Sequence, residues 1–175
     1  MIRTWRLLLR RWRESDREPF AVLNGDPEVM EHFPATLSRE QSDELIGRIE
    51  REFDRRGFGL WALETLEAGE LIGFAGLATP SFEAHFTPAV EVGWRLARPA
   101  WGHGYATEAA EAAIEVGFGQ AGLAEVVSFT AARNRRSRAV MERLGMVRDP
   151  AEDFDHPDLA VGDPLRRHVL YRRRA

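Results

Sequence analysis

The first third of the chain has apolar and polar positions that predict one strand followed by two helices. The apolar run at residues 4–12, TWRLLLRRW, is typical of a strand. Ser15–Glu18 and Ser38–Gln41 both fit the Ser-x-x-Glu/Gln pattern of a helix capping box, and apolar residues with helical spacing follow each of them. One face of the second predicted helix carries Leu45, Ile46, Ile49 and Phe53.

The segment at residues 57–97 predicts three strands. Apolar stretches at 57–66 and 71–79 flank the short turn EAGE, which indicates a hairpin. Residues 89–97 then alternate, which predicts a half-buried strand with a distinct polar face. The alternation sets Glu91, Gly93 and Arg95 against the apolar group Val90, Val92, Trp94 and Leu96.

The second half predicts a strand, loop, helix, strand unit, a short helix and a last strand. Apolar and small residues at helical spacing cover 106–118, and the strand AEVVSFTA follows at 124–131. Asn134 is placed to cap the short helix, which is expected to stop at Gly145. An acidic segment at 148–164 leads to the last predicted strand, at 166–173.

The loop WGHG, residues 101–104, joins the strand with the polar face to the helix that follows. Gly102 and Gly104 let the backbone approach a ligand closely, and the free amides of a first helical turn point at an anion, so a phosphate is expected here. A dinucleotide-binding loop requires a third glycine near Thr107 and a series of alternating strands and helices, and this chain has neither feature. A nucleoside-triphosphate loop needs a lysine.

Composition narrows the chemistry further. The 175 residues are 44% hydrophobic, which fits one domain over 1–175, and no apolar run reaches the roughly 20 residues of a membrane span. We therefore expect a cytoplasmic protein. There is no cysteine, and all 24 basic residues are arginine, so a thiol nucleophile and a lysine Schiff base are excluded. No metal site is expected, because the five histidines show no pairing typical of metal ligands.

Two stretches at the expected separation, VEVGWRLARPAWGHGYATEAAEAAIEVGF and ARNRRSRAVMERLGM, closely resemble the GNAT superfamily of acyl-CoA-dependent N-acyltransferases. The motifs in these two stretches are similar to those of the branch that includes the ribosomal-protein N-terminal acetyltransferases (RimJ/RimL type). The resemblance implies an α/β (α+β) fold with a mixed, mostly antiparallel seven-stranded sheet, about four flanking helices, and central strands that splay at the CoA site. In the superfamily the loop usually begins with Gln or Arg, whereas this chain has Trp101.

The resemblance also implies that acetyl-CoA is the cosubstrate and that backbone amides from Gly102 to Ala106 hold its pyrophosphate. His103 is then expected to expose its backbone, although a role as a base stays open. The full set of implied cofactor-binding residues is Val92, Gly93, Trp94, Trp101, Gly102, His103, Gly104, Tyr105, Ala106, Thr107, Asn134 and Ser137.

Two residues are implied to be catalytic. Glu91 is the candidate base that removes the proton of the amine, and the alternative is a strand glutamate that is solvated or ion-paired, for example with Arg95. Ser137 is the candidate hydrogen-bond donor to the departing thiolate. Gly93 is expected to permit a strand bulge that turns an amide toward the thioester oxygen. If Glu91 is structural, water or an acid such as Glu152 or Asp153 carries the proton instead.

The acceptor is the least determined part of the prediction. Protein N-termini, polyamines and aminoglycoside-like amines all stay open, and the acid-rich segments hint at a cationic amine. Direct transfer in a ternary complex is expected, because no covalent nucleophile is evident. A CoA-binding or sensor module without turnover is the alternative. A homodimer is allowed, and no nucleic acid or membrane partner is expected.

Overall fold

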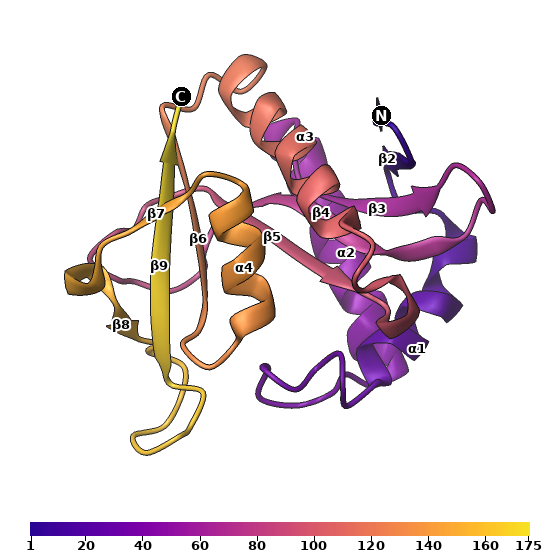
Figure 1. The fold of residues 1–175 in the computed structure, drawn as a ribbon. Coiled ribbons are helices and arrows are strands. Elements are labelled where there is room, and N and C mark those ends of the chain that lie inside the picture. Colours follow the sequence, from indigo (N-terminus) through magenta and orange to yellow (C-terminus); the bar gives the residue numbers. More distant parts are fainter.

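The computed structural model describes residues 1–175, and its strands form one mixed sheet (Figure 1). The order is β1-β2-β3-β4-β5-β6-β9-β7, with β8 paired to β9, and only the β5–β6 pair is parallel. The predicted mixed sheet is confirmed. It has nine strands rather than seven, because segments too short to show alternation add pairs to it. The strands are β1 (Ile2–Arg3), β2 (Leu7–Arg10), β3 (Leu60–Thr65), β4 (Leu71–Ala78), β5 (Glu91–Leu96), β6 (Glu125–Ala131), β7 (Val147–Arg148), β8 (Phe154–Asp155) and β9 (Arg167–Arg174).

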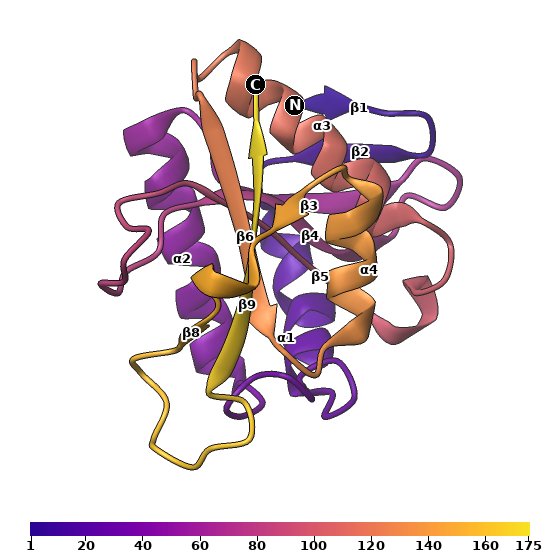
Figure 2. The same ribbon diagram turned by 60° about the vertical axis from the view of Figure 1, so that its left-hand side comes forward.

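Four α-helices cover the sheet, as predicted. They are α1 (Arg17–Gly25), α2 (Arg39–Arg56), α3 (Tyr105–Gly119) and α4 (Arg135–Arg143), and short 3-10 turns lie at Glu14–Asp16, Arg98–Ala100 and Pro150–Glu152. Figure 1 shows α3 in front of β4 and α2 behind it, and Figure 2 shows α4 beside β6 and β9. None of the helices is long and apolar enough to cross a membrane.

Side-chain contacts assign the helices to the two faces of the sheet. Phe20 of α1 packs on Phe74 of β4, with ring centroids 5.9 Å apart. On the opposite face, α3 approaches β4 so closely that a Cβ at Gly117 would lie 3.2 Å from Leu77 Cδ1. Because side chains alternate along a strand, this fixes the faces of β5 as well. Arg95 lies opposite Phe74 and faces α1, whereas Val92 lies opposite Leu77 and faces α3.

Helix α2 begins as its sequence predicts. Ser38 Oγ accepts a hydrogen bond from the Gln41 amide at 3.2 Å, and Gln41 Oε1 accepts one from the Ser38 amide at 2.8 Å. The helix ends at Gly57, whose φ of 78° is the left-handed conformation that glycine adopts without strain. The capping box at Ser38–Gln41 is therefore confirmed.

The predicted capping box at Ser15–Glu18 is wrong. Asp16 is buried, and its carboxylate accepts from the Arg13 amide at 2.7 Å and pairs with Arg10 at 2.7 Å. These bonds form a 3-10 turn, and α1 starts after it without a side-chain cap. Helix α1 starts later than predicted because the Asp16 carboxylate is paired with the buried Arg10 of β2.

Strands β5 and β6 diverge almost as soon as they meet. Their only paired residues are Glu91 and Val127, whereas β6 pairs with β9 over its whole length. Figure 1 shows the two strands separating. Backbone N–H and C=O groups alternate in direction along a strand. The Ala97 amide donates to Ile72 of β4, and the Val90 carbonyl accepts from Val127 of β6, so the backbone groups of the odd-numbered residues of β5 face β4 and those of the even-numbered ones face β6. The N–H and C=O groups of Trp94 therefore face the gap between β5 and β6.

The bulge expected at Gly93 does not occur. Strand β5 pairs with β4 without a register shift from Glu91 to Leu96. The divergence of β6 by itself frees the edge of β5, so no extra residue is needed to expose an amide.

Candidate functional site

A cavity of about 1220 Å³ occupies the gap between β5 and β6 and is lined by residues from both faces of the sheet. It is lined by β5, the glycine loop, the start of α4, β6, the loop after α1 and the region around β8 and β9. Small-molecule sites are usually about 300–1,000 Å³. This cavity is therefore large enough for two substrates at once. All but one of the predicted site residues line it, and the exception is Val92, which is buried against α3.

The glycine loop presents a row of free backbone amides on the α3 side. Gly102 and Gly104 have φ of 81° and 80°, which only glycine adopts readily. None of the amides from Gly102 to Thr107 donates to a protein acceptor, and the first amide of the α3 ladder is that of Glu108, which bonds to the Gly104 carbonyl at 3.1 Å. Six successive free amides at a helix N-terminus fit a phosphate group.

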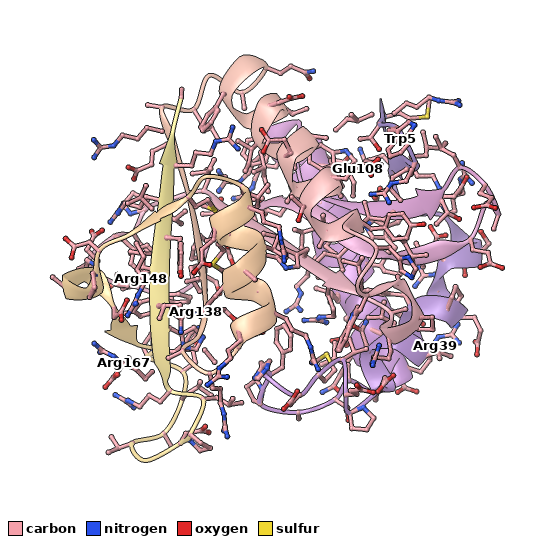
Figure 3. The ribbon with its side chains drawn as sticks, in the orientation of Figure 1. Trp5, Arg39, Glu108, Arg138, Arg148 and Arg167 are labelled. Carbon is pink, nitrogen blue, oxygen red and sulfur yellow. The ribbon has the colours of Figure 1, made fainter.

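Residues near the N-terminus hold this loop in place. Arg6 Nη1 donates to the His103 carbonyl at 2.8 Å, and Arg6 also pairs with Glu108 at 2.7 Å. Thr4 Oγ1 donates to Glu108 as well, at 2.6 Å. Figure 3 shows Glu108 on α3 facing the turn that carries Trp5. No motif in the sequence pointed to this brace.

Trp101, the first residue of the glycine loop, is fixed at the mouth of the loop. Its Nε1 donates to the Leu96 carbonyl at 2.8 Å, and the guanidinium groups of Arg98 and Arg136 lie 4.9 and 4.6 Å from its ring. Arg136, from α4, therefore brings positive charge close to the free amides. Sequence spacing did not single it out.

Asn134 and Ser137 lie together at the start of α4. Asn134 Oδ1 accepts from the Ser137 amide at 3.2 Å, so the predicted cap is present. Asn134 Nδ2 donates to Ser137 Oγ at 3.1 Å and to Thr130 Oγ1 at 2.9 Å. Because the Ser137 hydroxyl accepts from Asn134, its own proton is left to donate into the cavity.

Glu91 stands at the point where β5 and β6 part. It is half-buried, lines the cavity, and makes no hydrogen bond or ion pair with the protein. Burial raises the pKa of its carboxyl to about 8, because the charged form loses hydration without gaining a partner. A carboxyl with this pKa exchanges protons near neutral pH.

Arg95 shares the Glu91 face of β5, but the two side chains do not form the ion pair that was the structural alternative for Glu91. Its Nη1 donates to Asn24 Oδ1 at 2.7 Å, and its guanidinium lies 4.2 Å from the ring of Phe33 and 5.3 Å from that of Phe74. It forms no ion pair. The side chain lines the cavity on the side of α1 and the loop after it.

Two walls of aromatic rings complete this half of the cavity. His32 and Phe33 come from the loop after α1, and Phe129, His156 and His168 come from β6, the segment after β8, and β9. The His156 and His168 rings lie 5.0 Å apart. Burial lowers the pKa of His32, His156 and His168, so these rings are mostly neutral at pH 7.

The alternative proton acceptors lie outside the cavity. Glu152 pairs with Arg172 at 2.6 Å and Asp153 pairs with Arg148, and each of these pairings lowers the pKa of the carboxyl involved. Glu152 and Asp153 are therefore poor bases, and they do not line the cavity in which an amine would bind.

Tyr171 and His103, two other side chains that could transfer a proton, have structural contacts. Tyr171 is buried and its hydroxyl donates to Glu142 at 3.0 Å. His103 stacks on Tyr105, with ring centroids 5.5 Å apart. No cluster of three or more His, Cys, Asp or Glu side chains has the arrangement of a metal site.

Most acidic residues of the acid-rich segments have partners within the protein. Asp155 contacts Arg166 and Arg167, and Glu28 pairs with Arg98 at 2.6 Å. Much of the acidic charge in these segments is therefore paired with arginine, although Asp158 lines the cavity and is exposed.

Comparison with known proteins places the chain in a family. The model of the acetyltransferase (GNAT) domain matches residues 6–147. The protein YkkB of Bacillus subtilis, whose function is uncharacterised, is 31% identical over 144 residues, which cover 82% of this chain and 83% of that protein.

Solved structures show the same fold. An acetyltransferase from Agrobacterium tumefaciens superposes with a TM-score of 0.80 at 28% identity, covering 99% of this chain and 94% of that one. The ribosomal-protein-S5-alanine acetyltransferase of Vibrio fischeri superposes with a TM-score of 0.73 at 16% identity, covering 99% and 95% of the two chains.

Proposed function

Because the chain belongs to the GNAT acetyltransferase family, we propose that it transfers an acetyl group from acetyl-CoA to a primary amine, with both substrates bound at once. The observation that carries this proposal is the two-sided cavity. The free amides of residues 102–107 and the Asn134–Ser137 pair lie on the α3 and α4 side, whereas Glu91 faces the α1 side. The gap between β5 and β6 joins the two halves at Glu91.

On the α3 side, the free amides and the nearby Arg136 suit the pyrophosphate of acetyl-CoA. The pantetheine arm then runs along the freed edge of β5, where the Trp94 amide is available to bond to the thioester oxygen. A positioned donor at that oxygen stabilises the negative charge that develops during attack.

On the α1 side, Glu91 takes a proton from the amine. An alkylammonium has a pKa of about 10, so at pH 7 only about one molecule in a thousand is neutral. A carboxylate whose pKa is raised to about 8 is a stronger base than an ordinary glutamate. The transfer is direct, because the chain offers no cysteine and the cavity holds no activated serine.

Ser137 assists the leaving group. Its hydroxyl proton is free for the sulfur of the departing thiolate, since Asn134 already donates to its oxygen. Full protonation by Ser137 is unnecessary, because a thiol with a pKa of about 8.5 leaves readily as the thiolate. We therefore expect Ser137→Ala to slow transfer less than loss of Glu91 does.

Calorimetry and a thiol-release assay test this proposal. We expect acetyl-CoA to bind and NADPH not to bind. We also expect free CoA to form only when an amine is present, with protein N-terminal peptides, polyamines and aminoglycosides as the acceptor panel. His103→Ala should leave acetyl-CoA affinity nearly unchanged, because the loop contributes its backbone. Absence of acetyl-CoA binding would contradict the proposal, and binding without turnover on any amine would favour a CoA-binding module.

A further inference from the structure

We call the α1 side of the cavity, where the proposed amine binds, the acceptor half. It contains one arginine, Arg95, without a counter-charge. Arg95 is half-buried, whereas Arg10 is buried and pairs with Asp16 at 2.7 Å and Glu64 at 2.6 Å. Arg95 has neither kind of partner. Its sole hydrogen bond to the protein goes to the neutral side chain of Asn24, and its Nε is shielded from solvent without any acceptor. Buried charged groups are normally paired, so this exception requires an explanation.

The protein holds this guanidinium in place. Asn24 is fully buried, and its Nδ2 donates to Ser42 Oγ at 2.9 Å, so the amide that receives Arg95 is itself fixed. The rings of Phe33 and Phe74 lie within cation–π distance. Arg95 Nη2 has no protein acceptor. An arginine fixed in this way offers the N–H groups of Nη2 to a ligand without a further loss of side-chain entropy.

Three acidic residues line the cavity, Glu28, Glu91 and Asp158, and none of them forms an ion pair with Arg95. Asp158 is exposed in the segment after β8. Glu28 is taken by Arg98, and Glu31 lies 3.7 Å from Arg136. Glu91 is mostly protonated at pH 7, since burial raises its pKa to about 8. Burial lowers the pKa of Arg95 to about 10, which still leaves it charged at pH 7. Arg95 therefore carries a positive charge that no carboxylate of the protein pairs with.

We infer that Arg95 binds a carboxylate of the acceptor, so that the preferred substrates carry both a primary amine and a carboxylate. This inference rests on the proposed function. A single guanidinium with free N–H groups suits a carboxylate, whereas a phosphate would want more donors, such as the amide row on the other face. Glu91 and Arg95 are four residues apart on one strand, so their Cα atoms are separated by about 13 Å. Their side chains can thus engage the two ends of one extended small molecule.

The inference changes which acceptors are expected. Polyamines place a second positive charge where the cavity already has one, and like charges in a partly buried site repel. Amino acids with a terminal amine, short peptides with a free C-terminus and other amino carboxylates have the matching charges. Aromatic or apolar parts of such acceptors can pack against Phe33 and Phe129.

The test compares each acceptor as a free acid and as its carboxamide. Suitable pairs are 4-aminobutanoate and 6-aminohexanoate with their amides, together with phenylalanine and phenylalaninamide. For the wild type we expect the acid to have a kcat/KM about 10- to 100-fold higher than the amide, which is the range for a hydrogen bond to a charged group. In Arg95→Gln this preference should fall to about one, mainly through KM, while the amide and acetyl-CoA values stay close to wild type.

Two further variants keep the result interpretable. Arg95→Lys keeps the charge but loses the planar fork, so we expect a reduced preference that is not abolished. Arg39→Gln removes a surface arginine that pairs with Glu18 and Asp43 away from the cavity, and the preference should not change. Thermal unfolding of each variant verifies that it is folded.

Three results would overturn the inference or separate it from the proposed function. An equal acid-to-amide ratio in wild type and Arg95→Gln would remove Arg95 from acceptor recognition. A rise in the Kd of acetyl-CoA in Arg95→Gln, with the acid preference intact, would assign Arg95 to the cofactor instead. If no amine is acetylated, calorimetry with the same acids and amides on the CoA complex shows whether the anion site exists without the proposed activity. Arg95-dependent acid binding would then support the anion site while the proposed activity fails, and its absence would refute both.

Discussion

Replacing Glu91 with glutamine tests the assignment of the base, and the expected size of the effect follows from its environment. Moving a proton from an alkylammonium of pKa about 10.4 to an ordinary glutamate costs about 8 kcal/mol, at 1.36 kcal/mol per unit. With the pKa of Glu91 raised to about 8, the cost is about 3 kcal/mol. Glutamine has nearly the same shape and accepts no proton. We expect Glu91→Gln to lower kcat about 100-fold or more while acetyl-CoA affinity stays unchanged.

The pH dependence of the defect is more specific than its size. The wild-type kcat/KM should rise up to about pH 8, where Glu91 becomes mostly ionised, and then level off. The variant depends only on amine that is already neutral, so its rate should keep rising toward the pKa of the amine. The ratio of wild type to variant is therefore constant below about pH 8 and shrinks about tenfold per pH unit above it.

The assay is thiol release at saturating acetyl-CoA between pH 6 and 9.5. Glu67→Gln, which changes an exposed glutamate in the turn between β3 and β4, is the matched control and should follow the wild type. Near-normal turnover of Glu91→Gln over this range would return Glu91 to a structural role. A defect of constant size at every pH would also refute the reasoning, because it would show that the lost group does not titrate near 8.

A second measurement on Glu91→Gln and two other substitutions test the structure. Folding raises the pKa of Glu91 to about 8, so ionisation of Glu91 lowers the free energy of unfolding of the wild type as pH rises from about 4.5 to 8. Glu91→Gln lacks this loss, so between pH 4.5 and 8.5 its free energy of unfolding, measured with denaturant, should rise relative to wild type by up to about 5 kcal/mol. Gly104→Val should raise the acetyl-CoA Kd at least tenfold by disturbing the free amides, whereas Gly162→Val, at a similar φ in an exposed loop, should leave it unchanged in calorimetry. Asp16→Asn should lower stability by about 3 kcal/mol, measured by denaturant unfolding, because buried Arg10 loses a charged partner; a loss below 1 kcal/mol would contradict this.

The sequence by itself determined the features that depend on neighbours a few residues away. The glycines at 102 and 104, the cap at Asn134, the box at Ser38–Gln41 and the alternation around Glu91 are local patterns, and the structure contains all of them. Periodicity and capping are set within one or two turns of chain, so they can be read before folding. The motifs that carry the family resemblance belong to this class.

Only the tertiary structure decided the electrostatics of the site. The start of α1 moved because Arg10 draws Asp16 inward, and the glycine loop is braced by Arg6, which is 97 residues from His103. Arg95 depends on Asn24, 71 positions away, and lacks a carboxylate in a chain with 28 acidic residues. Burial and charge pairing arise from contacts between distant segments, which local periodicity does not encode. For the same reason, the raised pKa of Glu91 and the unpaired charge of Arg95 became evident only once the sheet had brought these residues together.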